Sequence, residues 1–296
     1  MARESTAVAS DPGARATTQQ CLTQLASVER TVDESITSVR DPLITIDGVN
    51  NVCHVGWLQV TNGEHGITLR LCQAVGVTSR ATLFDMDGLL IDSEVLWHRA
   101  EVEIFGHLGV PITQTEDRLT KGMFVREVVA YWYDRYPWTG PSQEAIVSQL
   151  LERVGDLVES DGRLLEGALR AIDMAAQRGP IALASSTPLA LIDRCLAHFG
   201  LLDRFALRYS AEFEPYGKPH PGVFLSAAAG LGVGAEDCLV FEDSSAGVTA
   251  AKAAHMSVVA VPAAEDRDLP AFAMADLVLG SLAELSADWL DRWFGA

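Results

Sequence analysis

Short apolar runs alternate with helical segments through the last two thirds of the chain. The runs that predict strands are ATLFDMD from residue 81, IALASS from 181, RFALRYS from 204, CLVFEDS from 238, SVVAVPA from 257 and DLVLG from 276. Apolar residues at helical spacing predict helices between them, at 189–199, 223–231 and 246–254. Strands that alternate with helices are typical of an α/β fold, a doubly wound parallel sheet with helices on both faces.

The first 80 residues follow a different pattern. Residues 1–16 are small and polar, which predicts disorder. Apolar residues at helical spacing predict a helix over 17–40, and short runs within 43–77, separated by turn signals, predict β-strands. Because no chemical motif lies in residues 1–80, we expect an N-terminal extension of unknown role that catalysis does not need. The alternative is an accessory segment of the enzyme, since these patterns are not those of random coil.

The remaining residues divide into a core and an insertion. Residues 81–93 and 166–296 contain the strands, whereas 94–165 is helical and predicts an inserted cap. Aromatic residues crowd the segment 131–138. They are explained either by a stacking surface for a sugar ring or by an apolar core of the cap itself, and we favour the core.

Composition narrows the classes of function. The 296 residues carry a net charge of −18, and such an acidic surface repels nucleic acid and anionic lipid, so we expect neither as a partner. The five cysteines show no CxxC spacing, and no apolar run reaches the length of a membrane span. We therefore expect a cytoplasmic protein with reduced thiols. We also favour a monomer.

Acidic pairs follow two of the predicted strands. Asp85 and Asp87 share a face where the first strand ends, and Glu242-Asp243 follows a later strand. Carboxylates held this close repel one another unless a cation relieves them, and Mg²⁺ prefers such oxygen ligands. A strand-end turn and an ordinary helix N-cap are the structural alternatives.

Two further clusters supply polar groups of other kinds. Ser185-Ser186-Thr187 places hydroxyls at a strand end before a helix, which suits an anion, although an ordinary helix N-cap is the favoured explanation of this cluster taken alone. Lys218, one of three lysines in the chain, lies between prolines in GKPHP and has the character of a rigidly held positive charge, or of a surface loop. Carboxylates, hydroxyls and a lysine at the strand ends of one sheet together predict phosphoryl transfer.

The four segments FDMDGLLIDSE, LASS, GKPHP and FEDSSAG resemble the motifs of the haloacid dehalogenase-like phosphohydrolases. Within that superfamily the chain resembles the β-phosphoglucomutase-like branch, which has a helical cap. It is similar in particular to the bacterial hexitol phosphatases and 2-deoxyglucose-6-phosphatases, and the cap segments LWHRAE and WYDRYPWTGPS share this similarity. The resemblance covers residues 81 to about 285 and implies a Mg²⁺-dependent phosphatase that acts on a small phosphate ester.

The resemblance also implies roles for individual residues. Asp85 would be the nucleophile that forms an aspartyl-phosphate, and Asp87 would be the general acid and base. Ser185, the amide of Ser186 and Lys218 would bind the phosphate. The implied metal ligands are Asp85, the main-chain oxygen of Asp87, Asp243 and Glu242, the last directly or through water.

The cap determines what is expected of the substrate. Lys121, Gly122 and Arg126 lie where this branch contacts its substrate, although a solvated cap surface is the alternative. Two positions depart from the family pattern. Phe124 stands where the similar phosphatases carry an arginine, and Trp97 stands where the mutases carry a histidine that handles sugar protons. We therefore favour hydrolysis of a sugar or hexitol phosphate over its isomerisation, with an inactive regulatory relative as the remaining alternative.

Overall fold

The structure is a computed structural model that describes residues 39–40, 57–62, 65–70, 80–112 and 123–295. The chain forms two compact units, Met1–Thr78 and Ser79–Ala296. Each unit is described by itself below.

The first unit contains a three-stranded antiparallel sheet in the order β1-β2-β3. Its strands are β1 (Val39–Arg40), β2 (Trp57–Asn62) and β3 (His65–Arg70). Strands β2 and β3 overlap two of the predicted apolar runs. The prediction of helix is wrong at Val39–Arg40, because these residues pair with Val60 and Gln59 of β2. The other elements predicted in residues 1–80 lie outside the described residues.

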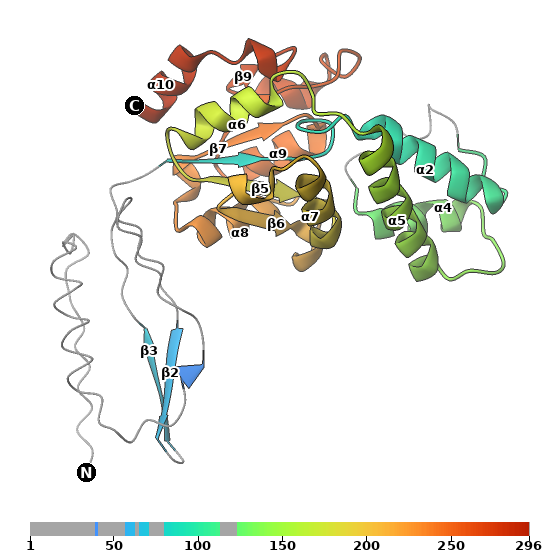
Figure 1. Cartoon of the computed structure of the whole chain (residues 1–296), viewed down its shortest axis with the longest axis horizontal. Helices are drawn as coiled ribbons and strands as arrows, with labels where there is room; N and C mark the ends of the chain where they lie inside the picture. The colour runs from blue at the N-terminus through green and yellow to red at the C-terminus, as the bar shows by residue number, and fades with distance from the viewer. Residues whose placement is uncertain (1–38, 41–56, 63–64, 71–79, 113–122, 296) are drawn as a thin grey trace. The chain divides into compact units, whose positions relative to one another are not determined.

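The second unit is built on a six-stranded sheet in the order β6-β5-β4-β7-β8-β9, and every neighbouring pair is parallel (Figure 1). Its strands are β4 (Ala81–Phe84), β5 (Ile181–Ser185), β6 (Leu207–Ser210), β7 (Cys238–Glu242), β8 (Ser257–Ala260) and β9 (Leu277–Val278). All six lie within the predicted runs, so the parallel α/β prediction is confirmed. The first strand of this sheet, β4, lies in its middle. Strands β5 and β6 extend the sheet on one side of β4, and β7, β8 and β9 extend it on the other, so the strand order reverses at β4. Ligands bind beyond the carboxyl ends of strands at such a point.

Helices cover both faces of this sheet. Successive side chains of a strand point to opposite faces, and apolar side chains on each face are buried against helices. Leu83 packs into one apolar cluster, with residues of α8 and α9, whereas Phe84 packs into a second cluster, with residues of α6, α7 and α10. These helices are α6 (Ala168–Ala176), α7 (Leu189–His198), α8 (Gly222–Leu231), α9 (Ser245–Ala253) and α10 (Ala287–Gly295). Short 3₁₀ turns complete the connections: η1 (Leu202–Arg204), η2 (Ala211–Phe213), η3 (Ala235–Asp237), η4 (Pro270–Met274) and η5 (Leu282–Glu284).

In the described part of the segment predicted as the cap, residues 94–165, the structure has the helices α2 (Glu94–His107), α4 (Val125–Arg135) and α5 (Gln143–Asp161), and this segment is called the cap below. Ser142 is the N-cap of α5, and its hydroxyl accepts a hydrogen bond from the Ala145 amide at 3.2 Å. Trp132 is fully buried, and the Phe105 ring lies 6.3 Å from it and 6.0 Å from the Trp138 ring. These aromatic residues therefore form the core of the cap, as the favoured interpretation predicted.

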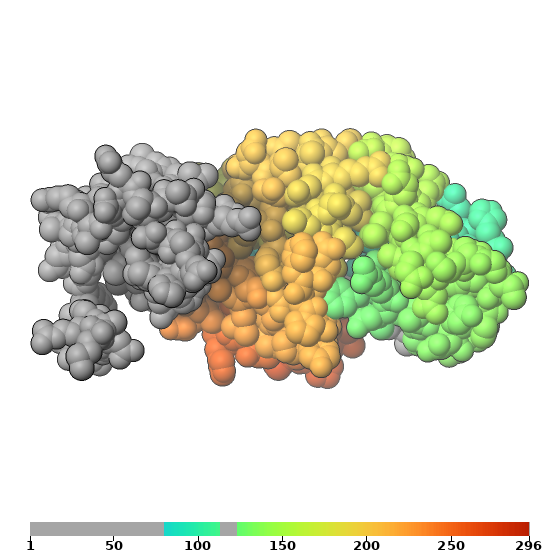
Figure 2. All heavy atoms as spheres, turned by 90° about the horizontal axis from the view of Figure 1, so that it is seen from below, coloured from blue at the N-terminus to red at the C-terminus, as the bar shows by residue number. Residues whose placement is uncertain are grey.

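The cap packs directly on the core. Arg194 of α7 forms ion pairs with Asp156 at 2.8 Å and with Glu159 at 2.7 Å, both on α5. In Figure 2 the green atoms of α5 accordingly lie against the yellow atoms of the core. Among the residues that the structure describes, no helix is both long enough and apolar enough to cross a membrane.

The division of the chain leads to a prediction about residues 1–74. A chain that starts at residue 75 retains the whole second unit, with both its apolar clusters. We expect it to fold and to turn over substrate at the rate of the full chain, which circular dichroism and a phosphate-release assay measure. An insoluble or inactive product, from a full chain that is active, would show that the N-terminal region is part of the enzyme.

Candidate active site

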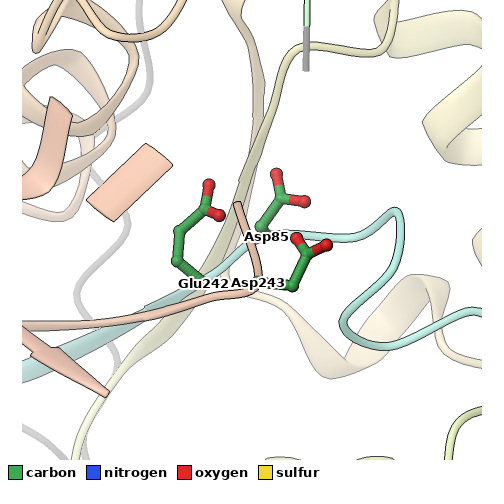
Figure 3. Close-up of side chains that lie close together, drawn as sticks. All are labelled: Asp85, Glu242 and Asp243. Carbon is green, nitrogen blue, oxygen red and sulfur yellow. The ribbon is translucent and has the colours of Figure 1, made fainter. Parts of the chain in front are cut away.

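The carboxyl ends of β4 and β7 bring three acidic side chains together. The two strands are neighbours, with Phe84 opposite Phe241, and the Asp85 amide donates to the Phe241 carbonyl at 3.1 Å. Asp85 follows β4, and Glu242 and Asp243 lie at the end of β7, with all three side chains on the same side of the strand ends (Figure 3). One carboxylate oxygen from each lies within 4.8 Å of the other two, and each residue is buried.

Lys218 supplies the positive charge of this cluster. Its ammonium lies 2.7 Å from Asp85 Oδ1 and 2.6 Å from Glu242 Oε1, and its side chain is only 3% exposed. Burial by itself would lower the pKa of this ammonium, but the charges of Asp85 and Glu242 raise it above its ordinary value. Lys218 is therefore a permanent cation, beside the carboxylate that the sequence marked as the nucleophile.

Asp85 experiences opposing effects. Burial raises the pKa of its carboxyl, Lys218 lowers it, and the negative charges of Glu242 and Asp87 raise it further, so that the net pKa is about 7. The cluster thus contains more negative charge than one lysine can balance, so it favours a further cation.

Glu242 is held through both of its carboxylate oxygens. Oε1 accepts from Lys218, while Oε2 accepts from the Ser244 amide at 2.9 Å and from the Ser244 hydroxyl at 3.0 Å. Gly247 also lies against this carboxylate, and a Cβ atom at Gly247 would overlap it. The absence of a side chain at Gly247 therefore allows Glu242 to reach Lys218.

Asp87 lies in the loop that follows β4 and accepts three side-chain hydrogen bonds. Oδ1 accepts from the Ser93 hydroxyl at 2.7 Å and from the Trp97 indole N–H at 3.0 Å. Oδ2 accepts from the Thr187 hydroxyl at 2.7 Å. Gly88, with φ of +74°, makes the turn next to this residue, and a Cβ there would overlap the Asp243 carboxylate.

The residues predicted to bind phosphate come from β5 and the segment after it. Ser185 ends β5, beside β4, and its buried hydroxyl accepts from the Thr187 amide at 3.2 Å. Ser186 follows directly. The Lys218 ammonium also lies 3.4 Å from the Ala184 carbonyl, so the lysine reaches the ends of both strands.

The predicted cap residues are less closely tied to this cluster. Lys121 and Gly122 lie outside the described residues. Arg126 is exposed on α4. Phe124, by contrast, contacts the core. Its ring lies close to Gly217, the residue before Lys218, and a Cβ at Gly217 would lie 2.8 Å from that ring.

The donor set fits Mg²⁺, which prefers carboxylate and carbonyl oxygens. Asp85 and Asp243 offer buried carboxylates on one side of Lys218, and a divalent ion would offset the negative charge that remains there. Glu242 belongs to the same cluster, but its oxygens already contact Lys218 and Ser244. That arrangement favours contact between Glu242 and a metal through water.

The sequence motifs do not identify the three residues that hold Asp87. Ser93 lies in the segment FDMDGLLIDSE with no predicted role, Thr187 belongs to the predicted hydroxyl cluster, and Trp97 is a departure from the mutase pattern. The spacing of Ser93 and Trp97, four residues apart, could have indicated that both face the same way on a helix.

Comparison with known proteins agrees with this geometry. Residues 80–255 match the haloacid dehalogenase-like hydrolase model. The chain is 44% identical over 209 residues to hexitol phosphatase B of Escherichia coli, covering 70% of this chain and 94% of that protein. It is 30% identical to the fructose-1-phosphate phosphatase YqaB of Escherichia coli, over 60% of this chain and 94% of that protein. CbbY of Rhodobacter sphaeroides, solved with phosphate, superposes with a TM-score of 0.63 at 30% identity, over 70% of this chain and 96% of CbbY.

The chain therefore belongs to the haloacid dehalogenase-like hydrolase family, within which it is a phosphatase.

The contact between Gly247 and Glu242 leads to a prediction. We expect Gly247→Ala to displace the Glu242 carboxylate from Lys218 and to lower kcat roughly a hundredfold, the usual scale for a lost electrostatic contact in an active site. The helical backbone itself prefers alanine, so unfolding of α9 is not the cause. Gly106→Ala in α2, where a Cβ would meet no atom within 4 Å, is the matched control and should retain activity. Equal activity of the two variants would contradict the assigned role of Gly247.

Proposed function

We propose that the chain is a Mg²⁺-dependent phosphatase of small sugar or hexitol phosphates that works through an aspartyl-phosphate. The observation that carries this proposal is the buried Asp85–Lys218 pair, with Asp243 beside it and Asp87 two residues further along the chain. The arrangement supports a carboxylate nucleophile with a fixed cation, next to a separate carboxyl that can exchange a proton.

In the first half of the reaction, an Asp85 oxygen bonds to phosphorus while the bond from phosphorus to the sugar oxygen breaks. Asp87 gives its proton to that oxygen, and the sugar leaves as a neutral alcohol. In the second half, Asp87 removes a proton from water as the water oxygen bonds to phosphorus. The bond to Asp85 breaks, phosphate leaves, and both residues return to their starting states.

The charges of the site require cations for the substrate to approach. At about 4 Å, each pair of like unit charges costs on the order of 4 kcal/mol at an effective dielectric of about 20. Lys218 offsets part of this repulsion, and Ser185 and the Ser186 amide would bind phosphate oxygens. Mg²⁺ would be held by Asp85, the Asp87 main-chain oxygen, Asp243 and, through water, Glu242, and it would supply charge neutralisation at the phosphate.

The substrate class rests on similarity and on the cap. The relatives that match most of this chain include a hexitol phosphatase and a sugar phosphatase, and the cap helices pack against the core near the strand ends. A closed cap admits small molecules and excludes water. Trp97, which donates to Asp87, favours hydrolysis over isomerisation, because an indole cannot pass protons between sugar hydroxyls. A cytoplasmic monomer remains a prediction.

The nucleophile is tested by Asp85→Asn. We expect the variant to lose all measurable turnover of sugar phosphates, because an amide can neither attack phosphorus effectively nor replace the anionic ligand. The assay is phosphate release, with thermal unfolding as a check of folding. EDTA should likewise abolish turnover by the wild-type protein, and added Mg²⁺ should restore it. Near-normal turnover by Asp85→Asn would rule out the mechanism.

The substrate class is tested by a phosphate-release screen across hexose, deoxyhexose, hexitol and pentose phosphates, with phosphopeptides as the comparison. We expect kcat/KM to be higher for at least one sugar or hexitol phosphate than for every peptide, because the cap restricts access. Sugar phosphates should also be examined for interconversion. Isomers in place of free phosphate would favour the mutase, and preference for peptides would contradict the role of the cap.

A further inference from the structure

The Asp87 carboxylate is held between the cap and the core. Trp97 of the cap helix α2 donates to Oδ1, and Thr187 of the segment after β5 donates to Oδ2. The Ser93 hydroxyl also donates to Oδ1. These partners differ in whether they can accept a hydrogen bond as well as donate one, and this difference distinguishes the two oxygens of Asp87.

An indole N–H can only donate a hydrogen bond, whereas a hydroxyl can rotate and either donate or accept. Ser93 and Thr187 can therefore adapt when Asp87 gains or loses a proton. Trp97 cannot, so its hydrogen bond persists only while Oδ1 remains an acceptor. The two oxygens of Asp87 are thus inequivalent, and Trp97 is the cause.

The position of the Trp97 ring is itself well determined. Ser93 is the residue before α2, and the Trp97 amide donates to its carbonyl at 2.9 Å, so the two side chains lie one helical turn apart. The indole ring is partly buried and packs against the larger apolar cluster. Its N–H is therefore directed at Oδ1 by the packing of the ring as well as by the hydrogen bond.

We propose that Trp97 is a positioning residue that keeps Oδ1 of Asp87 as an acceptor and assigns the exchangeable proton to Oδ2. The proposal rests on the proposed function. In the first half-reaction the proton moves from Oδ2 to the leaving oxygen, which keeps the electron pair of the broken bond to phosphorus. In the second half, a proton of the attacking water returns to Oδ2 as the water oxygen bonds to phosphorus.

The test is the dependence of kcat on the leaving group in Trp97→Phe, measured with phenyl phosphate and 2,4-dinitrophenyl phosphate on the full chain. Phenol leaves poorly without a proton, whereas dinitrophenol does not need one. We expect kcat for phenyl phosphate to fall roughly tenfold to a hundredfold, the scale of a lost hydrogen bond to a charged group. For dinitrophenyl phosphate it should fall by less than about threefold.

Three variants complete the experiment. Trp138→Phe makes the same substitution in the cap, where the indole donates to the Pro141 carbonyl at 3.1 Å, and it should leave the ratio of the two rates unchanged. Asp87→Asn should show the same difference between the two substrates as Trp97→Phe, with a larger loss of kcat for phenyl phosphate. Trp97→Gln keeps an N–H donor and should restore part of the phenyl phosphate rate, and it serves as the second variant if Trp97→Phe does not fold.

An equal loss on both substrates, or no loss on either, would overturn the role of Trp97 and leave the proposed function intact. Turnover by Asp85→Asn, or no turnover of either ester by the wild-type protein, would instead remove the proposed function and this inference with it.

Discussion

The contact between Lys218 and two buried carboxylates is the interaction on which this active site depends. Lys218 lies 2.7 Å from Asp85 and 2.6 Å from Glu242, in a place that water hardly reaches. Removing one partner of such a buried pair typically costs about 3–5 kcal/mol, because it leaves an uncompensated charge. The surrounding structure is accordingly arranged to preserve the contact, with Ser244 holding Glu242 and Gly247 leaving room for it.

The charge that Lys218 leaves unbalanced explains the chemistry of the site. The buried carboxylates of Asp85, Glu242 and Asp243 lie close together, and the one ammonium of Lys218 contacts two of them, Asp85 and Glu242. Such a cluster favours a divalent cation, and with that cation in place it can accept a phosphate dianion. The proposed nucleophile, the lysine and the proposed metal ligands therefore form one electrostatic unit, in which each charge depends on the others.

Asp87 belongs to a different arrangement, which joins the cap to the core. Its carboxylate accepts hydrogen bonds from α2 of the cap and from the segment after β5 of the core. In the proposed mechanism Asp87 releases and recovers a proton, and a carboxylate held from both sides suits that role, since proton transfer requires hydrogen-bond distances. The cap thus contributes to the position of a reacting group in addition to restricting access.

Much of this protein could be predicted from its sequence. The apolar runs and the helical spacing between them determined the parallel α/β fold, because both depend on local periodicity. The motifs also predicted that Asp85, Lys218, Glu242 and Asp243 lie close together, because strand ends meet at one edge of a parallel sheet, and the structure brings these four together. The short strand at Val39–Arg40 was missed, since its pairing with β2 overrides the helical pattern.

Only the tertiary structure decided which of these groups touch. Glu242 and Asp243 are adjacent in the sequence and look equivalent, yet Glu242 contacts Lys218 and Ser244, because the fold brings residue 218 to the end of β7. Trp97, Ser93 and Thr187 carry no motif that marks them as partners of Asp87, and Thr187 lies 100 residues from it in the chain. Their hydrogen bonds depend on how the cap helix and the β5 segment pack together, and local periodicity does not determine such distances between distant parts of the chain.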